Sequence, residues 1–216
     1  FFGALGYPGV LAVGALEVPA AVGPVTVGGE AVDLFANHHT TCVILGDGAV
    51  RCWGGNFWGS LGYGDYEAVG DDEDPALLGD VPLPAPATTL ALGQSHTCAL
   101  LTTDELYCWG SSLAGELGLG DLNPFGYPSP QLVPSGAPIA EFGLGAALTC
   151  VRESEGPVRC WGTGKEGQRA SGDTKDFGLT AAAAAAPAID FGAPIGARAL
   201  SVNNGHACAL LADGAR

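Results

Sequence analysis

Apolar positions recur with a period of two at four places in this chain, six and eight residues before a cysteine. The pairs are Leu34 and Ala36, Leu90 and Leu92, Phe142 and Leu144, and Leu200 and Val202. This alternation predicts strands with one face fixed by packing. After the cysteine the apolar positions become consecutive, as in Val43-Ile44-Leu45, which is typical of a strand covered on both faces. The blades of a propeller are covered in this way, because each lies between two neighbours.

These strands belong to a repeat whose first cysteines are spaced by 56, 52 and 58 residues, at Cys42, Cys98, Cys150 and Cys208. Repeats near this length are the mark of solenoids and propellers. The segment "FFGALGYPG" at 1–9 overlays "FWGSLGYGD" at 57–65, so we expect the chain to enter at the end of one repeat. We divide it into the end of a repeat plus a linker (1–30), a repeat (31–88), a second (89–137), a degenerate third (138–196) and the start of another (197–216).

A hairpin follows from the cysteine spacing. If Cys42 faces Cys52, then Leu45 faces Ala49 and three residues remain as the loop. Three-residue hairpin loops favour a left-handed residue at their last position. The four loops end in residue types that tolerate this conformation, namely Gly48, Asp104, Gly156 and Gly214. We therefore predict antiparallel hairpins centred near residues 47, 103, 155 and 213, and no helix across 31–54 or 89–110.

A tryptophan and a glycine pattern follow the second cysteine of each copy. The motif residues are Trp53, Gly59, Leu61, Gly62, Gly64 and Asp65 in the first copy, Trp109, Gly115, Leu117, Gly118, Gly120 and Asp121 in the second, and Trp161, Gly167, Gly172 and Asp173 in the degraded third. The glycines let the chain bend sharply and approach another backbone closely. Phosphate cradling is the alternative, but no Lys-Ser/Thr pair follows and no helix pattern begins.

The segments between copies are rich in proline, as in "DVPLPAPAT". Proline is tolerated on edge strands, so these segments suit the outermost strand of each blade. With 35 Gly and 15 Pro, the chain favours many short elements joined by turns. The predicted fold is all-β, a partial β-propeller of four-stranded antiparallel blades of about 52–58 residues.

Charge narrows the classes of partner. The formal net charge is −15, with only 8 Lys and Arg. Nucleic-acid binding needs a basic surface, and an anionic membrane surface would repel this chain. Its apolar runs are also much shorter than a membrane span. We therefore expect a protein partner, with no nucleic acid, no membrane and no cofactor.

Seven cysteines could be metal ligands, redox groups or disulfides. Zinc ligands usually lie two to four residues apart, and the cysteines here do not. Disulfides Cys42–Cys52, Cys98–Cys108 and Cys150–Cys160 would leave only Cys208, whose partner would fall two positions beyond residue 216. Disulfides are the favoured interpretation, and free core cysteines in a reducing compartment are the alternative.

Other candidates for chemistry have simpler explanations. His39, His96 and His206 precede their cysteines, but Leu148 takes this place in the third copy, so we expect hydrogen bonding at the strand entrance. The candidate calcium ligands are Asp71, Asp72, Glu73 and Asp74, although they lack the alternation of a calcium loop and runs of like charge are usually solvated. The sequence contains no nucleophile elbow, so we expect no catalytic residue and no enzyme activity in this chain.

The pattern "HTCALL…CWG…G-x-LG-x-GD" resembles the regulator of chromosome condensation repeat family, whose repeats of this length build seven-bladed propellers. The paired cysteines and the acidic composition look most like the bacterial, secreted branch of that family. Known members include a nucleotide-exchange factor that binds a small GTPase and chromatin, and a secreted inhibitor of β-lactamases. The resemblance transfers no functional residue to a position in this chain.

We therefore expect a non-catalytic, extracytoplasmic scaffold that binds a protein partner through loops at one rim. The candidate binding residues are the rim aromatics Phe57, Trp58, Phe125 and Tyr127. The alternatives are a propeller hydrolase or lyase with carboxylates and a histidine converging on the central channel, and a regulator of the guanine-nucleotide exchange type.

Overall fold

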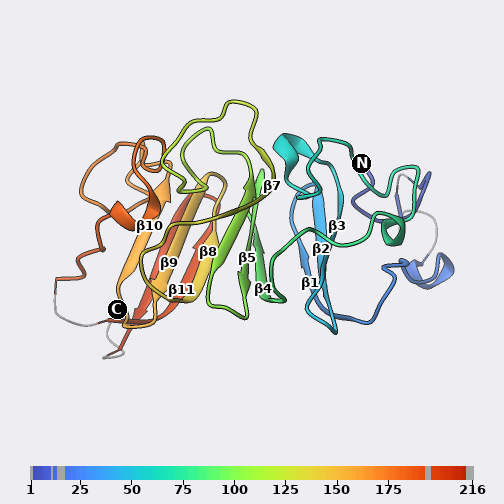
Figure 1. Ribbon diagram of the computed structural model, residues 1–216, viewed down its shortest axis with the longest axis horizontal. Helices are drawn as coiled ribbons and strands as arrows, with labels where there is room; N and C mark the ends of the chain where they lie inside the picture. Colours follow the sequence, from blue (N-terminus) through green and yellow to red (C-terminus); the bar gives the residue numbers. More distant parts are fainter. Residues whose placement is uncertain (1, 11, 14–17, 193–195, 213–216) are drawn as a thin grey trace.

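The computed structural model describes residues 2–10, 12–13, 18–192 and 196–212. Its strands form four antiparallel sheets, which follow one another in chain order across the molecule and which we call blades I to IV (Figure 1). Blade I contains β1 (Ala31–Ala36), β2 (Thr40–Leu45) and β3 (Val50–Gly54); blade II contains β4 (Ala87–Leu92), β5 (His96–Leu101), β6 (Leu106–Gly110) and β7 (Tyr127–Leu132); blade III contains β8 (Ile139–Leu144), β9 (Leu148–Glu153) and β10 (Val158–Gly162); blade IV contains β11 (Ala197–Asn203) and β12 (His206–Leu211).

The helical elements among the described residues are four single 3-10 turns. They are η1 (Pro19–Ala21), η2 (Phe57–Gly59), η3 (Pro75–Leu77) and η4 (Ala183–Ala185). The predicted all-β fold is therefore confirmed, and no helix crosses residues 31–54 or 89–110. Across the described segments, no helix has the length and apolar character needed to cross a bilayer.

Three of the four predicted hairpins are confirmed, with the predicted register. Cys42 faces Cys52 between β2 and β3, and the other two cysteine pairs face each other in the same way. Leu45 N donates to Ala49 O at 2.8 Å, which closes the three-residue loop. The last loop residues are left-handed, with φ of 83° at Gly48, 61° at Asp104 and 101° at Gly156. The hairpin expected near residue 213 lies outside the described residues.

The fourth strand of each blade is only partly as predicted. Blade II has β7 at its edge, and this strand contains Pro128 and Pro130. Blades I and III have three strands, and isolated bridges such as Gly54–Val69 and Arg159–Ala188 stand where a fourth would pair. In blade I the segment that follows Val81 has proline at every second position, and proline cannot donate to a ladder.

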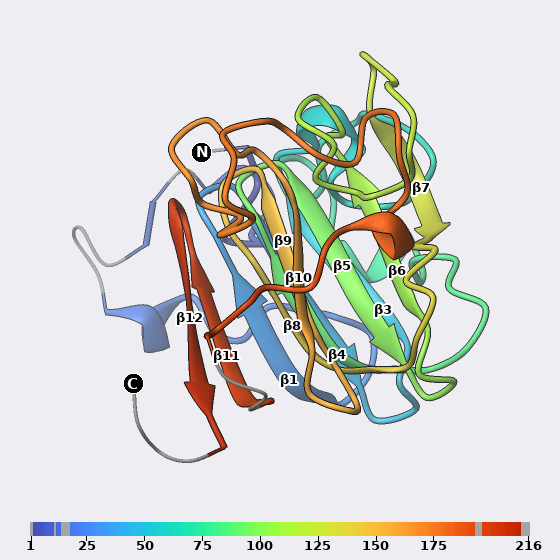
Figure 2. The same cartoon turned by 90° about the vertical axis from the view of Figure 1, so that its left-hand side faces the viewer.

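The burial of nearly identical strands shows how the blades cover one another. β5 reads HTCALL and is buried at all six positions, whereas β12 reads HACALL and is exposed at alternate positions. β5 lies in the middle of the assembly, while the β11–β12 hairpin stands at one end of it (Figure 2). The consecutive apolar residues therefore reflect packing on both faces of an interior blade, as the sequence pattern predicted.

Candidate functional site

The four aromatic residues expected in binding loops lie on two loops that touch. Phe57 and Trp58 lie in η2, which follows the last strand of blade I, while Phe125 lies in the loop before β7 and Tyr127 is the first residue of β7 in blade II. A Cβ on Gly126 would come within 2.6 Å of Trp58 O, so the two backbones are in contact. Gly126 has a φ of 75°, which only glycine adopts at low cost. The two touching loops therefore form one adjoining surface that carries the four aromatic residues.

Two further rings, which the sequence did not single out, join this surface. Phe2 packs on Phe57 with ring centroids 5.1 Å apart, and His39 lies 5.8 Å from Phe2 and 5.4 Å from Phe57, all in edge-on geometry. The overlay of "FFG" on "FWG" was the available signal for Phe2. We call these six residues, Phe2, His39, Phe57, Trp58, Phe125 and Tyr127, the aromatic rim.

The aromatic rim is exposed although its rings are large and apolar. The exposed fractions are 50% for Phe2, 43% for Phe57, 39% for Trp58 and 72% for Phe125. Trp58 has a φ of 60° and a ψ of 17°, and Phe2 has a φ of 61° at the equivalent position of the preceding repeat. Bulky residues in this left-handed region cost about 1–3 kcal/mol, so the surrounding contacts hold both backbones in place.

Tyr127 is the one polar member of the rim that is tied to a carboxylate. Its hydroxyl donates to Asp121 Oδ2 at 2.7 Å. Desolvation by burial and this hydrogen bond together raise the pKa of Tyr127 to about 12. The phenol therefore stays protonated and its ring stays fixed beside Asp121.

The tryptophan of each repeat lies at the joint between two blades. Its Nε1–H donates to a backbone carbonyl of the preceding repeat, over 3.1 Å from Trp53 to Ala4, 2.9 Å from Trp109 to Ser60 and 3.0 Å from Trp161 to Glu116. A threonine opposite the tryptophan donates to the same carbonyl, over 2.9 Å from Thr41, 2.9 Å from Thr97 and 2.7 Å from Thr149. We call this shared acceptor with its two donors the blade latch. In blade IV, Ala207 stands at the threonine position.

The motif glycines make room for the latch. A Cβ on Gly62 would lie 2.8 Å from Trp109 Nε1, and one on Gly118 would lie 2.7 Å from Trp161 Nε1. Both have positive φ, at 90° and 68°. These glycines let the indole of the next blade approach the loop.

The third copy keeps the turn although its sequence has changed. Ala170 N donates to Gly167 O at 3.0 Å, and Ala170 takes a φ of 51° where the other copies have glycine. Arg169 replaces the buried leucine of the motif and is itself buried. It bonds Asp173 Oδ1 at 2.7 Å and lies 5.4 Å from the Phe177 ring centroid, so the charge is paired.

His96 is buried between blades II and III, and its contacts are those of a structural residue. Its Nε2 lies 3.1 Å from Thr149 Oγ1, which donates its own hydrogen to Glu116 O, so His96 must be the donor. Burial lowers the pKa of His96 to about 4, which keeps the ring neutral. His39 is part of the aromatic rim and His206 is exposed at the start of β12. The three histidines are thus in different environments.

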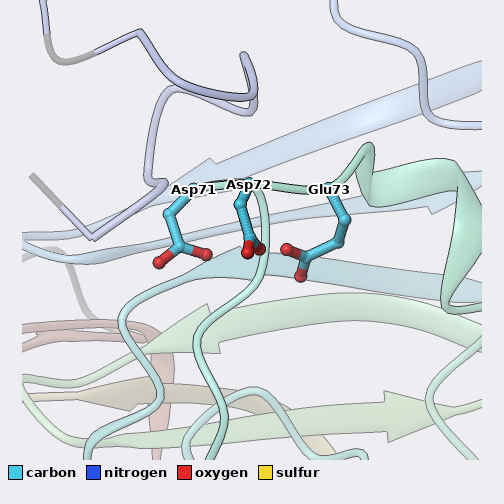
Figure 3. A group of neighbouring side chains, drawn as sticks. All are labelled: Asp71, Asp72 and Glu73. Atoms are coloured by element: carbon cyan, nitrogen blue, oxygen red, sulfur yellow. The ribbon is translucent and has the colours of Figure 1, made fainter.

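Three of the four candidate calcium ligands lie together (Figure 3). One carboxylate oxygen from each of Asp71, Asp72 and Glu73 lies within 4.8 Å of the others, whereas Asp74 caps η3 by accepting from Ala76 N at 3.1 Å. Burial and the hydrogen bond with Asp72 raise the pKa of Glu73. Calcium takes six to eight oxygen ligands, and two of these three side chains are exposed. We assign no ion to this cluster.

A hollow of about 440 Å³ lies beside the ends of β1, β4 and β11. Its polar lining consists of Asn37, His38, Gln94, Asn203 and Asn204. Carboxamides do not exchange protons near neutral pH, and none of the lining residues is a carboxylate. The lining of this hollow thus holds one histidine, His38, and no carboxylate.

The three predicted disulfides are present. Cys42–Cys52, Cys98–Cys108 and Cys150–Cys160 are each bonded across non-hydrogen-bonded hairpin pairs, with Cα atoms 4.1 Å apart. Cys52 has its remaining backbone groups satisfied by Tyr63, whose hydroxyl lies 3.0 Å from its N and 3.1 Å from its O. Cys208 is free and exposed.

Comparison with known proteins finds a family match for one stretch of the chain. Residues 87–116 match the family described as "Regulator of chromosome condensation (RCC1) repeat". Protein RCC2 of Homo sapiens is 32% identical over 127 residues, which cover 58% of this chain and 23% of that protein. The structure of human WBSCR16 matches with a TM-score of 0.69 at 18% identity, over 86% of this chain and 46% of that one. Prp20p from Saccharomyces cerevisiae matches with a TM-score of 0.67 at 17% identity, over 82% and 42%.

These likenesses show the fold, a segment of a β-propeller. The match to an RCC1 repeat covers residues 87–116. The chain spans about a quarter of RCC2 and less than half of either solved structure. The three relatives come from human and yeast, so they give no support to the expected bacterial branch.

Proposed function

We propose that this propeller segment is a non-catalytic scaffold that binds a protein partner through the aromatic rim. The observation that carries the proposal is the exposure of large rings on touching loops of two adjacent blades. Solvent-exposed apolar patches rimmed by polar residues mark interaction sites, and aromatic residues are enriched in protein interfaces. Trp58 adds to this, because its strained backbone holds a tryptophan in solvent at a cost in stability.

The class of partner has support from one solved relative. Prp20p of Saccharomyces cerevisiae has binding properties to Gsp1p and histones, which are proteins. At 17% identity the likeness is one of fold, so it supports a protein partner as a class and leaves its identity open to experiment.

The proposed location is extracytoplasmic. Three hairpins carry a bridged cysteine pair, and such bridges persist outside the reducing cytosol. The third copy keeps its pair although it has lost the motif leucine and one motif glycine. A cross-link explains why sulfur is kept at both positions.

The test is site-specific photo-crosslinking in the full-length protein, expressed in its own cells. A photoreactive residue at Phe125 should capture a partner protein, while the same residue at Thr103, in the hairpin loop at the opposite end of blade II, should not. The partner identified in this way is then measured against Trp58→Ala/Phe125→Ala, which should weaken binding at least tenfold. Thr103→Ala is the matched control. Equal capture at both positions, or full affinity in the double variant, would refute the proposal.

A further inference from the structure

The net charge is confined to one part of the chain. Residues 1–151 contain 16 of the 23 Asp and Glu and one of the eight Lys and Arg, while residues 152–216 contain seven of each. The one cation of the first part, Arg51, is largely buried and pairs with Asp80 at 2.8 Å. Blades I and II therefore carry essentially all of the formal charge of −15, with no free cation to offset it.

The aromatic rim lies within this acidic part. Asp65 accepts a hydrogen bond from Asn56, the residue before Phe57. A Cβ on Gly3, the residue after Phe2, would come within 2.5 Å of Asp71 N. Asp121 holds Tyr127. Each of the two rim loops, and the segment that carries Phe2, is thus flanked by a carboxylate, and residues 52–151 contain no Lys or Arg.

We infer that the aromatic rim binds a Lys/Arg-rich segment of a partner protein. This inference rests on the proposed function and adds the chemistry of the partner. Guanidinium and ammonium groups bind over the faces of aromatic rings, while their alkyl stems cover the apolar surface. The surrounding carboxylates attract such a segment over a longer range and repel acidic proteins. A Lys/Arg-rich segment can therefore bind the exposed rings and the negative charge around them at the same time.

Trp58 provides a direct signal for the test. The other three tryptophans are buried, so the emission that responds to a surface ligand is that of Trp58. The full-length protein is titrated with an octa-arginine peptide and with a neutral peptide of equal length. We expect the basic peptide alone to change the emission, and its affinity to fall at least tenfold between about 50 and about 300 mM salt. The change in emission should vanish in Trp58→Phe.

Matched variants separate the rim from the general charge of the protein. Asp71→Asn/Asp72→Asn removes two exposed charges next to the segment that carries Phe2. Phe57→Ala/Phe125→Ala removes two rings. Each double variant should weaken binding of the basic peptide at least fivefold. Asp104→Asn/Glu105→Gln removes two exposed charges at the opposite end of blade II, where Asn tolerates the left-handed backbone of residue 104. This control should stay within twofold of the unmodified protein.

Three results would overturn the inference. The first is equal weakening by the rim and control charge variants, which would mean attraction by net charge alone. The second is binding of spermine as tight as that of the peptide, which would assign the rim to a small polyamine. The third is a partner, captured at Phe125, whose crosslinked segment lacks Lys and Arg. In this last case the scaffold proposal stands and the basic partner is wrong.

Discussion

Trp109 Nε1 and the backbone carbonyl of Ser60 are hydrogen bonded at 2.9 Å across the joint between blades I and II. Thr97 donates to the same oxygen, also at 2.9 Å. The equivalent pair of donors meets one carbonyl at the two other joints, on Ala4 and Glu116. Both lone pairs of a buried carbonyl are thereby satisfied, and consecutive repeats are fixed in register.

Removing one latch donor should weaken the joint. Thr97→Ala takes a buried hydroxyl away and leaves Ser60 O with the Trp109 bond, so we expect a loss of about 1–2 kcal/mol in the free energy of unfolding. Urea denaturation measures this loss. Thr103→Ala, at an exposed position in the same blade, should change stability by less than about 0.5 kcal/mol. Equal stability of the two variants would show that the latch contributes nothing.

A methyl group added at Gly62 should lower the free energy of unfolding more than one added at a glycine with open space around it. Gly62→Ala combines a φ of 90° with a Cβ 2.8 Å from Trp109 Nε1, whereas Gly79→Ala has a φ of 82° and open space around it. We expect a loss of about 1 kcal/mol for Gly79→Ala from backbone strain, and roughly 2–4 kcal/mol for Gly62→Ala, where steric overlap adds to it. Thermal melting of both variants gives the difference. Similar melting temperatures would mean that the indole has room to move.

His96 should make stability depend on pH below neutrality. The unfolded imidazole has a pKa of 6.5 and the buried one a pKa of about 4. Below pH 6.5 the imidazole is protonated in the unfolded chain but stays neutral in the folded one. The contribution of His96 to the free energy of unfolding is therefore complete above pH 6.5 and is lost progressively towards pH 4. The loss is on the order of 3 kcal/mol.

The matched variant for this prediction is His96→Leu, the residue that the third copy has at this position. It keeps all carboxylates, so the difference in pH dependence between the two proteins isolates His96. Free energies of unfolding at about pH 7.5 and pH 4.5 provide the comparison, and parallel pH profiles would contradict a neutral, buried imidazole.

The disulfides should be present in protein from its own cells. Mass spectrometry under non-reducing conditions should find peptides linked as Cys42–Cys52, Cys98–Cys108 and Cys150–Cys160. Each bridge closes a short loop, so Cys98→Ala/Cys108→Ala should lose about 2–3 kcal/mol. Cys208→Ser is the control and should have little effect, because Cys208 is exposed and free. Full alkylation of all six cysteines would overturn both the bridges and the extracytoplasmic location.

The hairpins and bridges could be predicted because they are local. Cys42 and Cys52 lie ten residues apart, and the left-handed requirement at Gly48 fixes the register independently of the cysteines. For the outermost strand of each blade, the sequence predicted only that proline-rich segments would lie at the edge, and not where the strand would be replaced by other contacts. In blade I the hydroxyl of Tyr63 satisfies the backbone groups of Cys52 that a fourth strand would otherwise pair, and no pattern in the sequence announces this substitution.

The joints and the aromatic rim were less predictable, since both depend on contacts between distant residues. The acceptor of a latch is a main-chain carbonyl, and residues as different as Ala4, Ser60 and Glu116 supply it. The repeat pattern identified Trp109 and Gly62 as motif residues, but it did not predict that they would be in contact. Phe2 and His39 join Phe57 only because the end of one repeat folds back beside the next.

Because the blade latch is the same at each joint, the repeats are structurally interchangeable units. A repeat carries its donors in its hairpin and its acceptor in the loop that follows, so any copy with both can precede or follow any other. Gene duplication or unequal recombination by a whole period would then lengthen or shorten the array without creating a new kind of joint. Blade IV has Ala207 at the threonine position, so it lacks one of the two donors. A copy that lacks one donor forms a weaker joint with the repeat before it, so its place in the array is less freely exchanged.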